Sequence, residues 1–283
     1  MANRTISHLQ RSGVEQLKAA EIDNAVLDAR ILLQFASGYS HAGLSSNADQ
    51  VLTEETAELF HAFIARRVSG EPTQRILGYC EFYGRNFELS IDTLIPRQDT
   101  EILIDAALDI TKTKSGPMKI LDIGTGTGAI AVTLAAEIPN AEVLATDISN
   151  DALRTAQRNA SANHVSDRVR FRYSDLFSDV DGKFDLVISN PPYIPSGDLA
   201  ELQYEVREYD PCLALDGGAD GLIFYRRILE QVRTCLAASG NLIVEVGFDQ
   251  AEDVKSIAKE MSLSYVRSHS DLSGIERVLV FES

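Results

Sequence analysis

The 283-residue sequence contains no tryptophan and only three cysteines. Cys80, Cys212 and Cys235 are odd in number and far apart, and no C-x-x-C pair suggests a redox motif or a zinc site. The five histidines are equally scattered, without an H-x-x-x-H pair that would place two ligands on one face of a helix. We therefore expect no metal site, and this cysteine usage is typical of a reducing cytoplasm.

Long apolar segments are also missing. The longest nearly apolar run, residues 129–136, is far shorter than the roughly 20 residues that cross a bilayer. The first residues lack the apolar segment of a secretory signal peptide, and no Ser-, Pro- or Gly-rich tract is long enough to indicate disorder. These absences predict a folded cytoplasmic protein with no membrane partner.

Positive charge is scarce, because 26 Lys and Arg stand against 42 Asp and Glu and the formal net charge is −16. Residues 1–75 contain 7 of the basic and 9 of the acidic side chains, so most of the acidic excess lies in the rest of the chain. A field of this sign repels phosphate backbones. We expect no DNA partner.

The length suggests one large domain or two unequal ones, at roughly 150 residues per domain. Over residues 5–68 the apolar side chains recur at spacings of three and four, which predicts amphipathic helices. Over residues 78–95 apolar residues flank Gly84-Arg85-Asn86, which favours a β-hairpin. The expected organisation is a helical domain at 1–75, a hairpin linker at 76–98 and a larger domain at 99–283.

The larger domain alternates strands with helices, which is the pattern of a doubly wound α/β fold with a Rossmann-like sheet. A helix over residues 100–110 is expected to come first. The expected strands are 118–123, 142–145, 169–173, 184–189, 242–246 and 277–281, and the expected helices between them are 128–137, 150–162 and 250–260.

A glycine-rich loop ends the first of these strands. In Asp122-Ile-Gly-Thr-Gly-Thr-Gly128, the glycines stand where a chain must turn tightly and let a ligand approach the backbone. Asp147 closes the next strand, 19 residues after Gly128, and is placed to accept hydrogen bonds from two ribose hydroxyls. These residues fit S-adenosylmethionine, but they also fit NAD or FAD, or a tight turn without a ligand.

The segment Asn190-Pro191-Pro192-Tyr193 follows the strand at 184–189 and should reach the same crevice. The prolines donate no N–H and stiffen the loop. The Asn190 side-chain oxygen and the Pro191 carbonyl can accept the two protons of a planar NH₂ group, and the Tyr193 ring can stack on the group that carries it. Such a clamp would aim the nitrogen lone pair at an electrophile. The alternative is a rigid turn with a packed tyrosine.

At these residues the sequence resembles a known family, the glutamine N5-methyltransferases of peptide-chain release factors, called HemK or PrmC. The resemblance runs from about Arg66 to Arg227. It rests on the glycine loop, on Ser189-Asn-Pro-Pro-Tyr193, and on Gly70-Glu-Pro72, Ile76-Leu-Gly78, Glu81-Phe-Tyr-Gly84, Leu94-Ile-Pro-Arg97 with Thr100-Glu101, Asp210-Pro211 with Ala214-Leu215, and Gly218-x-Asp220-Gly221-Leu222. Asn-Pro-Pro-Tyr alone is shared with adenine-N6 methyltransferases, whereas Leu-Ile-Pro-Arg behind a small helical domain is more specific.

The resemblance implies a class I methyltransferase domain behind a small helical bundle and a hairpin linker. It implies that S-adenosylmethionine is bound by Gly124, Thr125, Gly126, Thr127, Gly128, Asp147, Leu176, Phe177 and Asn190, and the substrate glutamine by Asn190, Pro191, Pro192 and Tyr193, with Asn190, Pro191 and Tyr193 in catalysis. Two departures stand out: Gln98-Asp99 replace the usual Pro-Glu, and Leu176 replaces a common aromatic residue, so Leu176 offers apolar contact to the adenine.

Other charged and polar residues have two interpretations. Arg97, Thr100 and Glu101 either close the carboxylate end of the cofactor site or form the charged start of a helix. Arg66 and Arg67 end a helix of the first domain, where solvent exposure is expected rather than contact with a partner.

The expected activity is methylation of the side-chain amide of a protein glutamine, the one in the Gly-Gly-Gln segment of release factors. The helical domain would grip that protein, and a monomer is expected. The alternatives are a ribosomal-protein glutamine, adenine-N6 methylation of nucleic acid, which the charge disfavours, and a cofactor-binding module without activity. A module that only binds the cofactor would not need the two acceptors, at Asn190 and Pro191, that hold the NH₂ group of a substrate.

Overall fold

The computed structural model describes residues 4–112 and 116–283, and the chain divides after Gly78 into two units. Residues 1–3 and 113–115, which fall in the expected helical and methyltransferase domains, lie outside the described residues. The first unit therefore extends past the expected boundary at Arg75, which falls inside a short helix, and the second unit runs from Tyr79 to Ser283. None of the helices in the described ranges combines the length and apolar character needed to span a bilayer.

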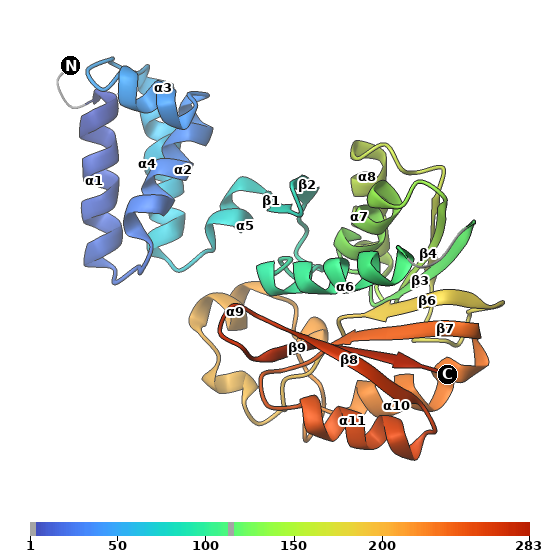
Figure 1. Cartoon of the computed structure of the whole chain (residues 1–283). Coiled ribbons are helices and arrows are strands. Elements are labelled where there is room, and N and C mark those ends of the chain that lie inside the picture. Colours follow the sequence, from blue (N-terminus) through green and yellow to red (C-terminus); the bar gives the residue numbers. More distant parts are fainter. Residues whose placement is uncertain (1–3, 113–115) are drawn as a thin grey trace. The chain divides into compact units, whose positions relative to one another are not determined.

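The first unit consists of helices, as the apolar spacing predicts (Figure 1). Three of them begin at a hydroxyl side chain, Thr5, Ser40 or Thr53, which accepts a hydrogen bond from a backbone N–H three residues on. Leucines of the first two helices pack on Phe60 and Ile64 in one buried cluster. The helices are α1 (Ile6–Ala19), α2 (Ala25–Ser37), α3 (His41–Ser46), α4 (Glu54–Val68) and α5 (Thr73–Leu77).

An ion pair lies inside this unit. Arg67 Nε donates to Asp28 Oδ2 at 2.7 Å, and both side chains are almost fully buried. The expectation that Arg67 forms a solvated helix end is therefore wrong, whereas the side chain of Arg66 is exposed and binds Glu71 at the surface. Arg67 turns inward because α2 brings Asp28 to the buried face of α4.

The predicted hairpin is present as strands β1 (Tyr79–Phe82) and β2 (Arg85–Glu88). Phe82 and Phe87 are buried in the core beneath α6 (Glu101–Thr111). The hairpin thus packs as part of the second unit, whereas α5 belongs to the first, so the segment expected as a linker at 76–98 is shared between the two units.

The second unit is built on a seven-stranded sheet in the order β5-β4-β3-β6-β7-β9-β8. Only β9 runs antiparallel to its neighbours, which confirms the expected doubly wound α/β fold. The order places β4 and β6 on opposite sides of β3, and in such sheets ligands bind beyond the carboxyl ends at this point. The strands are β3 (Met118–Ile123), β4 (Ala141–Asp147), β5 (Val169–Tyr173), β6 (Phe184–Ser189), β7 (Leu236–Glu245), β8 (Ser264–Ser270) and β9 (Glu276–Glu282).

Helices cover both faces of this sheet (Figure 1). One face carries α6, α7 (Ala129–Glu137) and α8 (Asn150–Ala162), and its core is rich in alanine, valine and isoleucine. The other face carries α10 (Ile223–Gln231) and α11 (Ala251–Glu260), packed on a second apolar core. A short helix, α9 (Tyr204–Tyr209), lies in the long connection after β6.

Candidate active site

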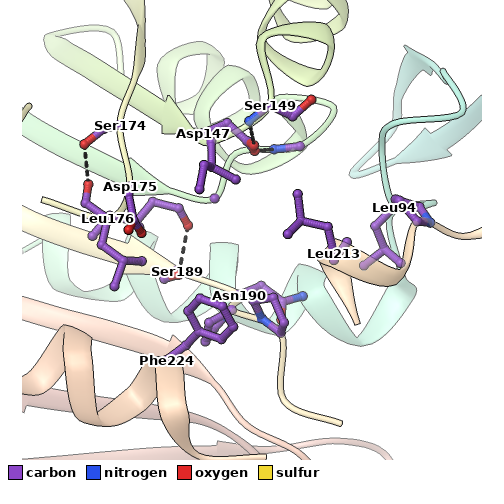
Figure 2. A pocket seen from close by; sticks show the side chains of 18 of the residues that line it. Leu94, Asp147, Ser149, Ser174, Asp175, Leu176, Ser189, Asn190, Leu213 and Phe224 are labelled. Atoms are coloured by element: carbon purple, nitrogen blue, oxygen red, sulfur yellow. Dashed lines mark hydrogen bonds between the residues drawn. The ribbon is translucent and has the colours of Figure 1, made fainter. Parts of the chain in front are cut away.

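A cavity of about 310 Å³ lies at the carboxyl ends of β3, β4 and β6 (Figure 2). The strand ends bring together residues that are far apart in the sequence, such as Gly124 and Asn190. Of the residues predicted for cofactor or substrate, the structure brings Gly124, Gly126, Asp147, Leu176, Asn190, Pro191 and Pro192 to its wall.

The glycine loop leaves room for a ligand at two positions. Gly124 and Gly126 have φ values of 73° and 55°, and a Cβ atom added to either would meet nothing within 4 Å. The loop is held by the Thr146 carbonyl, which accepts from the backbone N–H groups of Gly124 and Thr125, each at 2.9 Å. Side chains at the two glycines would be strained and would point into open space.

The other loop residues serve the loop itself. The Thr125 hydroxyl donates to the buried Asp122 carboxyl at 2.6 Å, and the Thr127 carbonyl accepts from Asn159 at 2.8 Å. A Cβ on Gly128 would lie 3.0 Å from the Cβ of Ala156 in α8, so this glycine permits a close approach of the loop to a helix. None of Thr125, Thr127 and Gly128 lines the cavity, although all three were predicted to bind the cofactor.

Asp147 ends β4 with its carboxylate at the cavity (Figure 2). Its Oδ2 accepts from the Gly126 N–H at 2.9 Å and its Oδ1 from the Ser149 N–H at 2.8 Å. Burial raises the pKa of this carboxyl, and the backbone N–H groups oppose that rise. Each oxygen has further lone pairs. Asp147 can therefore accept from two hydroxyls of a ligand, as the sequence predicts.

An apolar part of the wall was only partly foreseen. Leu176 lines it, with φ at 52°, whereas Phe177 lies in the core of the second unit and is absent from the wall. Phe224 of α10 supplies an aromatic ring instead (Figure 2). Arg227 lies 5.9 Å from the centre of that ring and donates to Asp175 at 2.8 Å.

Neither Phe224 nor Arg227 was predicted. The resemblance to the family extends to about Arg227, but the last motif that carries it ends at Leu222, directly before α10. Ile148, which follows Asp147, lines the same cavity and could have been found from that neighbour.

Asn190 projects from the end of β6 to the cavity wall (Figure 2). Its Nδ2 donates to the Thr100 hydroxyl oxygen at 3.2 Å. Directly before it, the Ser189 hydroxyl donates to the Ile123 carbonyl at 2.8 Å and ties β6 to β3. The amide nitrogen of Asn190 is thus held by a buried threonine.

Tyr193 occupies a different place from the expected one. Its ring packs on the core of the second unit and is not part of the cavity wall. Its carbonyl accepts from Gln250 Nε2 at 2.8 Å, and its ring lies beside Gly247, where an added Cβ would be 3.4 Å from Cδ2 of the ring. Burial, with the nearby charge of Glu245, raises the pKa of its phenol to about 12. Its stacking on the substrate remains a prediction.

The polar and charged residues around the start of α6 (Arg97, Thr100 and Glu101) do not line the cavity. Arg97 donates to Asp210 at 2.7 Å, and Glu101 accepts from the Tyr83 N–H at 2.7 Å. Thr100 is buried against Asn190. Across residues 4–112 and 116–283, no group of three or more His, Cys, Asp or Glu is arranged to hold a metal ion.

The fold and this site define an S-adenosylmethionine-dependent class I methyltransferase. Residues 99–205 match the family model "Methyltransferase small domain", and residues 8–78 match "PrmC N-terminal domain". A release factor glutamine methyltransferase of Bradyrhizobium diazoefficiens is 42% identical over 98% of this chain and 94% of its own length. Another, of Rhodospirillum rubrum, is 43% identical over 97% and 84%. The chain belongs to the family of release factor glutamine methyltransferases.

A solved structure shows the same fold. A methyltransferase from Pyrococcus furiosus is 21% identical, with a TM-score of 0.52 over 77% of this chain and 96% of its own. The wall of the cavity fits S-adenosylmethionine, the cofactor of the family: open space at Gly124 and Gly126, acceptors at Asp147, and apolar surface at Leu176 and Phe224.

Proposed function

We propose that this protein transfers a methyl group from S-adenosylmethionine to the side-chain amide nitrogen of a glutamine in a peptide-chain release factor. The observation that carries the proposal is the position of Asn190, whose side chain lines the same cavity as Gly124, Gly126 and Asp147. An acceptor for amide protons thus stands beside a cradle for the cofactor. The names of relatives at 42–43% identity supply the kind of substrate.

S-adenosylmethionine, when bound, supplies the methyl group as a cationic sulfonium electrophile. Gly124, Gly126 and Asp147 would hold its methionine and ribose parts, and Leu176 and Phe224 would flank the adenine. Asn190 Oδ1 and the Pro191 carbonyl would accept the two protons of the glutamine NH₂ group. Pro192 keeps the loop stiff, and Tyr193 supports it from the core side.

An amide nitrogen is a poor nucleophile, so its methylation depends on how the nitrogen is held, and this arrangement would hold it. Its lone pair is delocalised into the carbonyl, and holding both N–H bonds orients the lone pair toward the electrophile. As the bond from nitrogen to the methyl carbon forms, the bond from that carbon to sulfur would break and leave S-adenosylhomocysteine, and the methylated nitrogen would release one proton to solvent. The rate enhancement then comes from orientation and fixed dipoles, and no strong base is required.

The location, the oligomeric state and the contact with the release factor also belong to this proposal. We infer that the protein acts in the cytoplasm, where release factors terminate translation, and that it works as a monomer without DNA. The helical unit would bind the release factor outside the cavity. Light scattering on the purified protein, alone and mixed with the release factor, tests the monomer and a complex.

The test is transfer of a labelled methyl group to a purified release factor and to ribosomal proteins, with the labelled residue identified by mass spectrometry. We expect label on one glutamine of the release factor. Asn190→Ala should lower turnover by about 10²-fold, the usual cost of one preorganised hydrogen-bonding group, with cofactor affinity unchanged in calorimetry. Label on a ribosomal protein or on nucleic acid alone, or parallel loss of cofactor binding, would contradict the proposal.

A further inference from the structure

A buried carboxylate stands behind Asn190, outside the cavity wall. Glu245 ends β7, the strand next to β6, and the register pairs Ser189 with Val244, so Asn190 and Glu245 follow at neighbouring strand ends. Glu245 is only 3% exposed. The side chains of Thr100 and Asn190 are near enough to lower the pKa of this carboxyl, while its Oε2 is buried without a hydrogen-bond partner in the described structure.

The contacts fix which way the Asn190 amide faces. Its Nδ2 donates one proton to the Thr100 oxygen at 3.2 Å. Because Asn190 also lowers the pKa of the Glu245 carboxyl, as a donor to a carboxylate does, we infer that its second proton lies on the side of that carboxyl. Thr100 accepts from Asn190, so its own proton is available to the carboxylate. An ionised carboxylate can only accept hydrogen bonds. The nitrogen of Asn190 must therefore face Thr100 and Glu245, which leaves Oδ1 for the cavity.

We propose that Glu245 and Thr100 are positioning residues that hold the Asn190 amide with its oxygen toward the substrate and thereby select an NH₂ group. A flipped amide would present its own NH₂ group to the cavity and would favour a carboxylate ligand. The inference rests on the proposed glutamine methylation and adds a basis for choosing glutamine over glutamate, which has nearly the same shape.

The charges around Glu245 come from several elements. Asp99 of the short 3₁₀ helix Gln98–Thr100 and Arg277 of β9 act on it directly. Tyr193 and Tyr225 lie close enough for Glu245 to raise the pKa of both phenols. Burial raises the pKa of the Glu245 carboxyl to about 7. Protonated Glu245 can donate to Asn190 Oδ1 and stabilise the flipped amide, so turnover should fall as the pH drops through about 7.

The experiment compares wild type with Glu245→Gln and Thr100→Val, using a short glutamine peptide and the matching glutamate peptide. Glutamine at position 245 can donate or accept, and valine at 100 removes the hydroxyl at nearly constant shape. We expect kcat on the glutamine peptide to fall about 10- to 100-fold in both variants, as for a small misplacement of a reacting group. Glu245→Gln should also lose the acid limb of the pH profile.

Binding gives a readout that does not depend on turnover. Calorimetry with S-adenosylhomocysteine present should show that wild type prefers the glutamine peptide, and that both variants narrow this preference at least several-fold. Thr100→Ser, which keeps the hydroxyl, should restore most of the preference. Glu142→Gln, at an exposed position of β4, is the matched control for loss of one carboxylate.

The outcomes separate this inference from the proposed function. If wild type methylates no glutamine, the proposed function fails and the inference falls with it. If wild type methylates glutamine and both variants match it in kcat and peptide preference, only the inference is overturned. If Glu245→Gln does not fold, Thr100→Val decides alone. A loss of kcat with unchanged peptide preference and a matching drop in melting temperature would assign these residues a structural role and also overturn it.

Discussion

Asp147 has two tasks at the scale of a single residue, because its oxygens hold the Gly126 and Ser149 N–H groups and face the cavity as well. Asp147→Asn leaves one acceptor oxygen and no charge. A hydrogen bond to a charged group is worth roughly 1.5–3 kcal/mol, so affinity for S-adenosylmethionine should fall about 10- to 100-fold in calorimetry. Asp151→Asn, at the exposed start of α8, should leave it unchanged. Equal affinities of wild type, Asp147→Asn and Asp151→Asn for S-adenosylmethionine would show that Asp147 does not bind the cofactor.

Arg66 and Arg67 are neighbours in α4 with opposite surroundings. Arg67 is buried against Asp28, whereas Arg66 pairs with Glu71 at the surface. Breaking a buried pair costs about 3–5 kcal/mol because one charge is left uncompensated, so Arg67→Ala should lower the unfolding temperature of the helical unit markedly. Arg66→Ala should cost less than about 1 kcal/mol. Scanning calorimetry of the full chain checks both, and similar shifts would contradict the assignment.

The sequence predicts those residues of the site that stand at the end of a strand. Asp147 and Asn190 each follow an apolar run, and parallel strands bring such positions to one edge. Phe224 and Glu245 could not be found in this way. Phe224 lies on a helix whose apolar residues also serve the core, and Glu245 reads in the sequence as one more acid at a strand end. Only the packing of β6 against β7 shows that Glu245 lies behind Asn190.

At the scale of elements, the glycine loop and α8 pack closely at Gly128. This residue has φ at 80°, and an added Cβ would lie 3.0 Å from one Ala156 atom and 3.2 Å from its Cα. Gly128→Ala should therefore cost about 1–2 kcal/mol for the left-handed backbone and about 1–3 kcal/mol more for overpacking.

The matched control is Gly84→Ala in the turn between β1 and β2. Its φ is 70°, and nothing lies within 4 Å of an added Cβ, so only the backbone cost applies. Urea denaturation of both variants, followed by circular dichroism, measures the difference. Equal losses of stability would show that the contact with Ala156 relaxes without cost.

Most elements of the second unit were predictable, because its buried strands are apolar, and the helices between them are either apolar, as α7 is, or amphipathic, as α8 is. The expected strands at 118–123, 169–173 and 184–189 have the bounds of β3, β5 and β6. The sequence predicts no strand at β8, since its residues are mostly exposed at the edge of the sheet and carry no apolar alternation. The beginning of β7 was missed for a similar reason: it starts at Leu236, before the apolar run at 242–246.

At the scale of the whole molecule, the two units divide the charge unevenly. Residues 1–75 carry a net −2, so the acidic excess belongs almost entirely to the unit that contains the cavity. A nearly neutral helical surface suits contact with a protein of either charge, whereas the negative charge of the second unit disfavours contact with free nucleic acid. This division favours a protein substrate held by the first unit and modified in the second.

The N-terminal unit can be removed without touching the site, since every residue of the cavity wall lies after Tyr79. A chain beginning at Tyr79 should bind S-adenosylmethionine as tightly as the full protein, and calorimetry checks that it is folded. Contacts outside the cavity help to orient a whole substrate, so kcat/KM on the release factor should fall by about 10-fold or more on truncation.

A short glutamine peptide makes none of these remote contacts with the full protein. Removing the helical unit therefore takes no binding energy from the peptide, and its kcat/KM should change less than about 2-fold. Comparing the two substrates therefore shows whether the helical unit binds the release factor or stabilises the catalytic unit. Equal losses on peptide and release factor, with cofactor binding intact, would mean that the helical unit keeps the catalytic unit in its active form. Full activity on the release factor would leave the helices without a part in substrate binding, and the acidic unit would then have to recognise the release factor by itself.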